Sequence, residues 1–147
     1  MKYLAVIEQT KTGYSGFIPD FDTSIIAAHP TLEGVKILLS EALSIHAQET
    51  ELPAPQAQKL EDVSDLEDTD ELLVAMIEPA PINPVSLEIA DAMKTQNLRP
   101  ADLARRLGVS RANMVRVIDP FYFGHSLALL NRVAEALGRK LKVKLEM

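Results

Sequence analysis

The segment PAPINP at residues 79–84 holds three prolines in six positions and divides the chain into two patterns. Proline fixes φ and removes a backbone donor, so this composition favours an extended, semi-rigid connector. Before it, short apolar runs are separated by turn residues, as is typical of strands. After it, apolar residues recur at helical spacing. The sequence therefore predicts an α+β protein with two domains, 1–78 and 85–147, joined by this linker.

The first domain is expected to have the element order βββαβ. Gly13 and the pair Pro19-Asp20 provide turns between apolar runs, and Thr31 is a plausible N-cap with Glu33 in the first helical turn. The elements expected, in order, are strands at 2–8, 13–20 and 23–28, a helix that begins after Thr31, an exposed loop at 51–70 and a buried strand at 71–78.

The second domain is predicted to be helical with a strand at its end. The helices expected lie at 86–97, opening on Ser86, and at 101–107, 110–118 and 126–137. The closing run KLKVKLE at 140–146 alternates apolar residues with the lysines 140, 142 and 144, which is typical of a half-buried strand whose lysines face solvent. A lone strand leaves backbone groups unpaired, so we expect it to pair with the same strand of a second copy, in a homodimer or tetramer.

Charge is distributed unevenly between the two parts. The whole chain has a formal net charge of -6, but residues 1–81 hold 4 Lys+Arg against 15 Asp+Glu, a net -11. Residues 82–147 hold 11 against 6, a net +5. Because potentials of opposite sign attract opposite ligands, the two domains are expected to bind different partners.

Several classes of protein are disfavoured by what the sequence lacks. There is no cysteine, which excludes disulfides and Cys-ligated zinc. The start MKYLAVIEQT turns polar at Glu8, too early for a secretory signal, and no apolar run approaches the roughly 20 residues of a membrane span. We therefore expect a cytoplasmic protein with no membrane partner.

The stretch LRPADLARRLGVSRANMVRVI has the spacing of a helix-turn-helix motif. Ala104 is small where two helices would cross closely, Gly108 can adopt the left-handed conformation that ends a helix, and Ser110 can cap the next one. Leu103, Val109, Met114 and Val117 would seal the interface between the two helices. The coincidence of these features favours DNA binding over a helical bundle with a merely solvated arginine face.

The side chains expected to contact DNA follow from this placement. In such motifs the N-terminal residues of the second helix reach base edges in the major groove. Arginine pairs with guanine and asparagine with adenine, so Arg111, Asn113 and Arg116 are the predicted base contacts. The predicted phosphate contacts, which give affinity without sequence information, are Arg99, Arg105 and Arg106.

Taken in order, YLAVIE, GYSGFIPDF, TLEG and the C-terminal LARRLGVS and LNRVAEALGRKLKVKLE resemble the HicB antitoxin family. The resemblance covers nearly the whole chain; Pro19 and Asp20 match the family's Pro-Asp pair, whereas FDTSIIAAH and Gly34-Val35 depart from its usual pattern. It implies a partial RNase H-like first domain that binds and neutralises a small basic HicA-like mRNA-cleaving toxin. It further implies that the second domain binds double-stranded operator DNA and represses its own operon. It assigns no toxin contacts beyond the two motif matches.

Two other functions stay open at this stage. One is a one-component transcriptional regulator whose first domain senses a small ligand. The other is a metal-dependent nuclease, for which the available carboxylates are Glu8, Asp20, Asp22, Glu33 and Glu41. Surface or partner-facing roles suit these carboxylates better, so we expect no catalytic residue, no metal and no cofactor.

The histidines and the aromatic cluster are expected to have structural roles. His29, His46 and His125 are too scattered for a metal pair at helical spacing. DPFYFGH at 119–125 gathers three aromatics at a helix-to-helix corner, where closing the core is the favoured role over stacking on nucleic acid. One of Phe121 and Phe123 is therefore expected to be buried.

Overall fold

The computed structural model describes residues 1–64, 66 and 71–147. The predicted α+β class is confirmed, because the described residues form a four-stranded antiparallel sheet and five α-helices. The chain divides into two compact units, Met1–Pro81 (unit 1) and Ile82–Met147 (unit 2), each described by itself below. The predicted loop at 51–70 includes residues 65 and 67–70, which lie outside the described residues.

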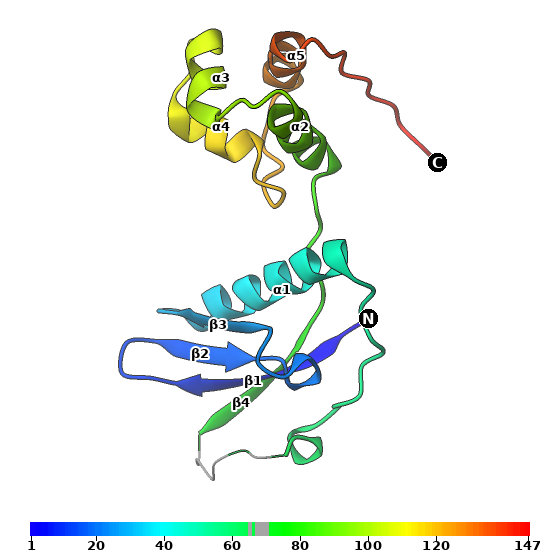
Figure 1. Ribbon diagram of the computed structural model, residues 1–147. Coiled ribbons are helices and arrows are strands. Elements are labelled where there is room, and N and C mark those ends of the chain that lie inside the picture. The colour runs from blue at the N-terminus through cyan, green and yellow to red at the C-terminus, as the bar shows by residue number, and fades with distance from the viewer. Residues whose placement is uncertain (65, 67–70) are drawn as a thin grey trace. The chain divides into compact units, whose positions relative to one another are not determined.

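Unit 1 is built on one sheet with the strand order β3-β2-β1-β4 (Figure 1). The strands are β1 (Tyr3–Gln9), β2 (Tyr14–Phe17), β3 (Ile26–His29) and β4 (Leu72–Ile77), and every neighbouring pair is antiparallel. Because β4 follows the helix yet pairs with β1, the central strand joins residues that are far apart in the sequence. The RNase H-like assignment of this unit stays a prediction.

The second and third strands are shorter than predicted. β2 ends at Phe17 because Pro19–Phe21 form a short 3-10 helix, η1, and the backbone at Asp22 has a φ of 53°. The chain therefore turns over 18–25, and β3 begins at Ile26, where the prediction had placed its start at residue 23.

Helix α1 (Leu32–Glu49) lies across one face of the sheet (Figure 1). The predicted N-cap is confirmed: the Thr31 hydroxyl accepts a hydrogen bond from the Gly34 N–H at 3.0 Å. The core between helix and sheet consists mainly of buried side chains from β1 and the inner face of α1: Tyr3, Ala5, Ile7, Val35, Leu39 and Leu43. Their spacing alternates by two along the strand and by about four along the helix, which is why both patterns were visible in the sequence.

The opposite face of the sheet is partly covered by the segment that follows α1. Buried Leu4 and Val6 contact Ala57, and the half-buried Leu60 and Val63 pack around them. This segment has little regular structure apart from the 3-10 turn η2 (Leu60–Asp62), so side-chain contacts to the sheet hold it in place.

The prediction that 71–78 is a buried strand is wrong in one respect. β4 is a strand, but it is an edge strand, and Leu73, Val74 and Met76 are 43%, 45% and 42% exposed. A continuous apolar run is compatible with a central strand and with an exposed edge strand. The hydrophobic pattern of a segment does not indicate how many strands lie beside it.

Unit 2 is a cluster of four helices around one core. The helices are α2 (Pro84–Thr95), α3 (Pro100–Leu107), α4 (Arg111–Val117) and α5 (Leu127–Ala136). Leu103, Met114, Val117 and Val133 are completely buried at its centre. No helix in the described part of the chain has the length and apolar character that crossing a membrane requires.

Helix α2 begins two residues before the predicted start. Its N-cap is Asn83, whose side-chain oxygen accepts a hydrogen bond from the Val85 N–H at 3.1 Å, and Pro84 takes the first helical position. Proline suits that position because its missing N–H would have no helical partner there. Ser86, the predicted cap, is instead buried inside the first turn.

The predicted strand at 140–146 is absent from the single chain. Residues 139–147 have no regular secondary structure, and Val143 and Leu145 are 64% and 101% exposed. Leu141 alone packs against the unit 2 core. The physical reason is that a strand needs a neighbour for its N–H and C=O groups, and one copy of the chain supplies none at this place.

Candidate nucleic-acid interface

Helices α3 and α4 are joined by a tight turn with the local geometry that the sequence predicted. Gly108 ends α3 in the left-handed conformation, with φ 66° and ψ 32°, and the Val109 N–H donates to the carbonyl of Ala104 at 3.1 Å. The Ser110 hydroxyl then accepts from the Asn113 N–H at 3.1 Å and caps α4. These three features give the chain a sharp change of direction between two short helices.

The helix pair is held by the residues that were expected to seal it. Leu103 and Ala104 of α3 and Met114 and Val117 of α4 are all buried. A small side chain at position 104 fits the close approach of the helices, since a larger one would separate them. The buried face of α4 is therefore fixed, and its other face points to solvent.

That outer face of α4 carries the predicted base-contacting residues. Arg111, Asn113 and Arg116 are exposed, and Val115, half exposed, lies between them. The backbone N–H of Asn113 donates to the Ser110 cap. Its exposed side-chain amide is a separate donor and acceptor that can face DNA. The arrangement presents two guanidinium groups and one amide, the chemistry that reads guanine and adenine.

Arg116 also contacts an aromatic ring, which sequence reasoning missed. Its guanidinium carbon lies 5.7 Å from the centroid of the Tyr122 ring, and Tyr122 in turn stacks edge-on against His125 at 4.7 Å. Two hydrogen bonds from Asn83, to the carbonyls of Pro120 and Tyr122, hold this corner of the chain. The guanidinium of Arg116 therefore makes a cation–π contact with Tyr122 while the residue stays exposed.

The expectation that Phe121 or Phe123 is buried is wrong. Phe121 is half-buried and Phe123 is 58% exposed. The corner is closed by polar contacts of the Asn83 side chain and by Tyr122 instead of by a buried phenylalanine.

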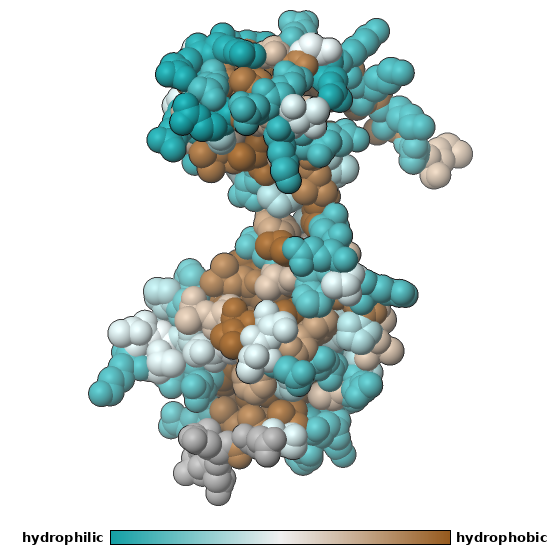
Figure 2. Space-filling view, in the orientation of Figure 1, coloured by the Kyte–Doolittle hydropathy of each residue, from teal (hydrophilic) through white to brown (hydrophobic). Residues whose placement is uncertain are grey.

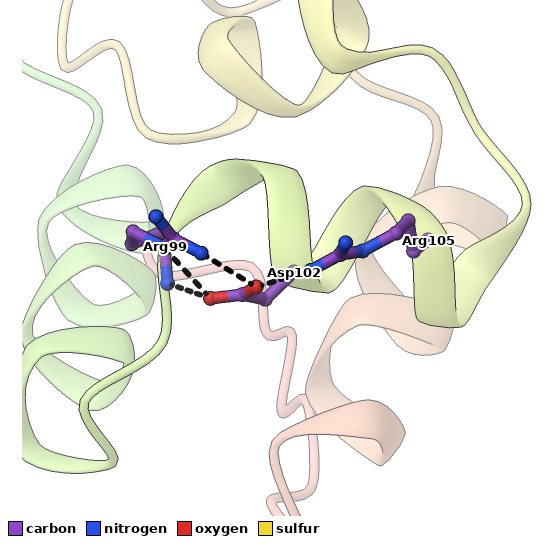
Figure 3. Close-up of polar contacts among 3 residues, drawn as sticks. All are labelled: Arg99, Asp102 and Arg105. Carbon is purple, nitrogen blue, oxygen red and sulfur yellow. Dashed lines mark hydrogen bonds and ion pairs between the residues drawn. The ribbon is translucent and has the colours of Figure 1, made fainter.

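Two of the three predicted phosphate contacts are brought together by one carboxylate (Figure 3). Asp102 accepts from the Arg99 backbone N–H at 2.9 Å, from the Arg99 side chain at 3.4 Å and from the Arg105 guanidinium at 2.6 Å. Asp102 thus caps α3 and orients both arginines. Arg106 is exposed and has no ion pair among the described residues.

These contacts lower the pKa of Asp102. The backbone N–H of Arg99 has the largest effect, its side chain the next, and together with Arg105 they bring the pKa of the Asp102 carboxyl to about 2. Both arginine side chains are largely exposed, so salt screens these charge interactions. The local cluster keeps a net positive charge, because one carboxylate faces two guanidinium groups.

Arg132 is a further arginine that sequence reasoning did not single out. It lies on α5 and donates a hydrogen bond to the carbonyl of Leu107, the last residue of α3. Cations at a helix C-terminus satisfy free carbonyls and offset the helix dipole. No local pattern indicates this contact, since the two residues are 25 positions apart.

Comparison with known proteins gives a likeness to a solved structure at low sequence identity. No protein-family model matches the chain, and no curated protein matches it. A solved structure described as the crystal structure of antitoxin HicB3 is similar to it. The two share 22% identity, the match covers 75% of this chain and 99% of that one, and the TM-score is 0.43. The HicB resemblance of the sequence motifs therefore stays a prediction.

The motif matches Pro19 and Asp20 have structural contacts within unit 1. Pro19 opens the 3-10 turn η1, and the two carboxylate oxygens of Asp20 accept hydrogen bonds from the backbone N–H groups of Gln56 and Ala57, at 3.0 and 3.1 Å. Asp20 therefore anchors the segment that covers Leu4 and Val6. Nothing in this geometry assigns either residue to a partner.

The carboxylates considered for a nuclease do not converge. Within residues 1–64, 66 and 71–147, no three acidic or histidine side chains form a group able to hold a metal ion. Asp20 uses both oxygens on backbone donors, and Glu8 lies beside β4 in register with Leu72. The histidines pack locally: His46 contacts the Phe21 ring, and His29 accepts from the Thr31 N–H.

Proposed function

We propose that this protein is a HicB-type antitoxin: its basic unit 2 binds operator DNA through α4 and represses its own operon, while its acidic unit 1 captures and neutralises a small basic HicA-like toxin. In this proposal the protein is not an enzyme, needs no cofactor and works in the cytoplasm.

The outer face of α4 is the observation that carries the DNA-binding part. Arg111, Asn113 and Arg116 stand exposed on a helix whose other face is locked by buried Met114 and Val117. A helix that reads a major groove needs one buried face and one exposed polar face. The buried face fixes its position, and the polar side chains of the other face reach the bases. Arg106, free of ion pairs in the described part of the chain, and the Arg99–Asp102–Arg105 group supply positive charge close by in the sequence of unit 2.

Binding to the DNA upstream of the protein's own gene tests this part. The full chain is titrated into a labelled duplex of that sequence and into a scrambled duplex of equal length, at several salt concentrations. We expect tighter binding to the upstream duplex and a linear fall of log affinity with log salt. Equal affinity for both duplexes would contradict sequence-specific repression of the operon.

Charge carries the toxin-binding part. Unit 1 has a net charge of -11 and only four lysines or arginines over 81 residues. A protein that binds RNA is expected to be basic, and an acidic partner can attract it at long range and occupy its anion-binding surface.

Co-expression with the product of the adjacent open reading frame tests the toxin-binding part. We expect that product to be a small basic protein that co-purifies with this chain, and we expect co-expression to relieve the growth inhibition that the product causes alone. A neighbour that is acidic, or that never binds, would count against neutralisation.

A symmetric dimer would complete the operator-binding form. A groove of about 330 Å³ runs between α2 and α5 beside the tail, lined by Ile89, Leu130 and Leu137 among other apolar residues and edged by Glu88 and Asp91. In this proposal the tails of two copies pair as antiparallel strands, with Val143 and Leu145 turned toward these grooves and the lysines outward. Two copies of α4 would then read two half-sites about one DNA turn apart.

A one-component regulator is the second candidate, and one observation favours it. Unit 1 contains an open groove of about 640 Å³ lined by Phe17, Asp20, Asp22, Gln56 and Asp62, among others. Its three carboxylates would suit a cationic small ligand. Thermal shift assays with polyamines, followed by DNA binding with and without any hit, separate this function from toxin capture.

A further inference from the structure

The outer edge of β4 is unpaired and apolar. β4 pairs with β1 along six residues, from Leu72 to Ile77, and on its other side no strand in the described part of the chain lies beside it. None of its six residues is charged, and none is proline. Proteins usually protect such an edge with a charge, a proline or a bulge inside the strand, so an edge without these devices marks a place where another strand can bind.

Both faces of this edge offer apolar contacts to an added strand. On one face Val74 and Met76 lie beside Val6 and Leu4. Side chains from the segment after α1, among them Ala57 and Leu60, cover Val6 and Leu4, whereas Val74 and Met76 stay exposed. On the other face Leu73 is exposed next to the layer that α1 packs on. In Figure 2, brown hydrophobic surface is visible in unit 1 between its teal hydrophilic areas.

The opposite edge of the sheet is less suited to pairing. β3 has four residues against six in β4, and Pro30 follows it directly. Proline has no N–H to donate and stops the ladder there. β3 does carry one large exposed apolar side chain, Ile26, which makes it a useful control.

Charge decides what kind of strand fits. Glu71 and Glu78 flank β4, so an antiparallel pair of two β4 strands centred on each other would place Glu71 opposite Glu78 at both ends. Like charges directly opposite one another destabilise a strand pair, and each copy of unit 1 also has a net charge of -11. A second copy is therefore disfavoured. Lysines or arginines at the ends of an incoming strand would instead meet Glu71 and Glu78, although the exposed Glu78 carboxylate also lies 3.6 Å from the Lys2 ammonium group.

We propose that the free edge of β4 receives an extended strand of a basic partner protein, which joins the sheet as its fifth strand. Backbone hydrogen bonds to the outer side of β4 provide affinity, Leu73, Val74 and Met76 contact its apolar residues, and Glu71 and Glu78 select positive charge. This inference rests on the proposed capture of a basic protein by unit 1 and places that capture at one strand.

A designed peptide tests the edge directly. The probe is a synthetic peptide of about eight residues that alternates lysine and valine, titrated into the full-length protein by fluorescence anisotropy. We expect saturable binding, at least about tenfold weaker in Val74→Lys. Ile26→Lys, which adds the same charge to the β3 edge, should bind like the unmodified protein. Circular dichroism and thermal unfolding establish that both variants are folded.

Two further peptides separate strand pairing from simple charge attraction. In one, alternate backbone amides are N-methylated, which removes half of the donors but keeps every charge; in the other, glutamate replaces lysine. We expect both to lose binding. Undiminished binding of the N-methylated peptide, or equal binding by Val74→Lys and Ile26→Lys, would overturn the proposal.

The same variants distinguish this inference from the proposed function. If the basic product of the neighbouring reading frame co-purifies equally with Val74→Lys and the unmodified protein, toxin capture stands and the β4 site is wrong. If the lysine–valine peptide binds at β4 but no basic neighbour binds the protein, the edge is a docking site and the antitoxin function is wrong.

Discussion

At the scale of single residues, short polar contacts set the geometry of the candidate interface. One carboxylate, Asp102, orients Arg99 and Arg105, one serine caps α4, and one glycine permits the turn between the helices. Each of these contacts is local in sequence, with partners three to five positions apart. Single substitutions can therefore separate their contributions.

Arg111→Ala is expected to reduce the preference for the upstream duplex. Loss of a bidentate contact to a base costs about 1–3 kcal/mol of specific binding and leaves binding to scrambled DNA almost unchanged. Arg106→Ala should instead weaken binding to both duplexes equally and lower the salt slope by about 1. Fluorescence anisotropy over a salt series measures both quantities. If Arg111→Ala and Arg116→Ala both kept the full preference, α4 would not be the reading helix.

Gly108→Ala is expected to destabilise the protein by about 1–2 kcal/mol. A Cβ at this position meets no atom within 4 Å, so the whole effect comes from the left-handed backbone with φ 66°. Gly108→Asn is the matched control and should cost less, because asparagine tolerates this conformation better. Urea unfolding measures both. Equal costs for alanine and asparagine would show that backbone strain is not the cause.

The stabilising effect of Asp102 is expected to disappear at low pH. Its pKa is lowered to about 2, below the roughly 3.9 of an unfolded aspartate, so its contribution is present above pH 4 and is lost as the pH falls toward 2. Thermal unfolding of the protein and of Asp102→Asn at pH 5 and pH 2 tests this. The difference in Tm between the two proteins should shrink at the lower pH, and more salt should reduce it at pH 5. A difference independent of pH would contradict the assignment.

At the scale of elements, side-chain anchors hold segments that have no regular structure. The segment after α1 is tied to the sheet by Asp20, by the Tyr3 hydroxyl, which donates to the carbonyl of Pro53, and by apolar contacts to Leu4 and Val6. The contact to Asp20 spans 36 positions, so it forms only when the sheet and the segment are both in place.

Asp20→Ala is expected to loosen this segment. Removing the acceptor leaves the N–H groups of Gln56 and Ala57 without a protein partner, at a cost of about 1–3 kcal/mol. Hydrogen exchange should speed up at these two amides and stay slow in α1. The control is Asp22→Asn, which removes the charge of an exposed aspartate on the same turn but keeps a side chain that tolerates its φ of 53°. Faster exchange in both variants would mean that the hydrogen bonds to Asp20 are not what holds the segment.

At the scale of the whole molecule, the chain presents an acidic unit and a basic unit whose boundary lies within the proline-rich connector. The proposed function uses this division, because one surface must attract a basic protein while the other attracts DNA. The unpaired tail offers a surface for dimerisation, and a protein that binds two DNA half-sites must be at least a dimer.

The tail is expected to control assembly. Val143→Asp should shift a dimer toward monomer, because it puts a charge into the apolar side of the paired strands, and Lys144→Asp, on the outward side, should leave the dimer intact. Sedimentation velocity measures the two species. The monomeric variant should also bind a duplex with two half-sites more weakly, while its affinity for a single half-site stays the same. Identical sedimentation of both variants would place the dimer contact elsewhere.

What the sequence determined by itself is the local structure. The α+β class, the N-caps Thr31 and Ser110, the left-handed Gly108 and the buried residues of α3 and α4 follow from periodicity and from contacts between near neighbours. Such interactions depend on a few adjacent dihedral angles, so the order of residue types is enough to indicate them. The exposed arginines of α4 were predictable for the same reason.

The tertiary structure decided everything that depends on distant partners. It placed β4 at the edge of the sheet, gave Asp20 to the backbone of residues 56 and 57, and left Phe123 exposed. It also left residues 139–147 without a strand, although apolar residues and lysines alternate there as in a strand. Strand neighbours and long-range hydrogen bonds depend on how the elements pack together. They therefore cannot be predicted from the residue order of one segment alone.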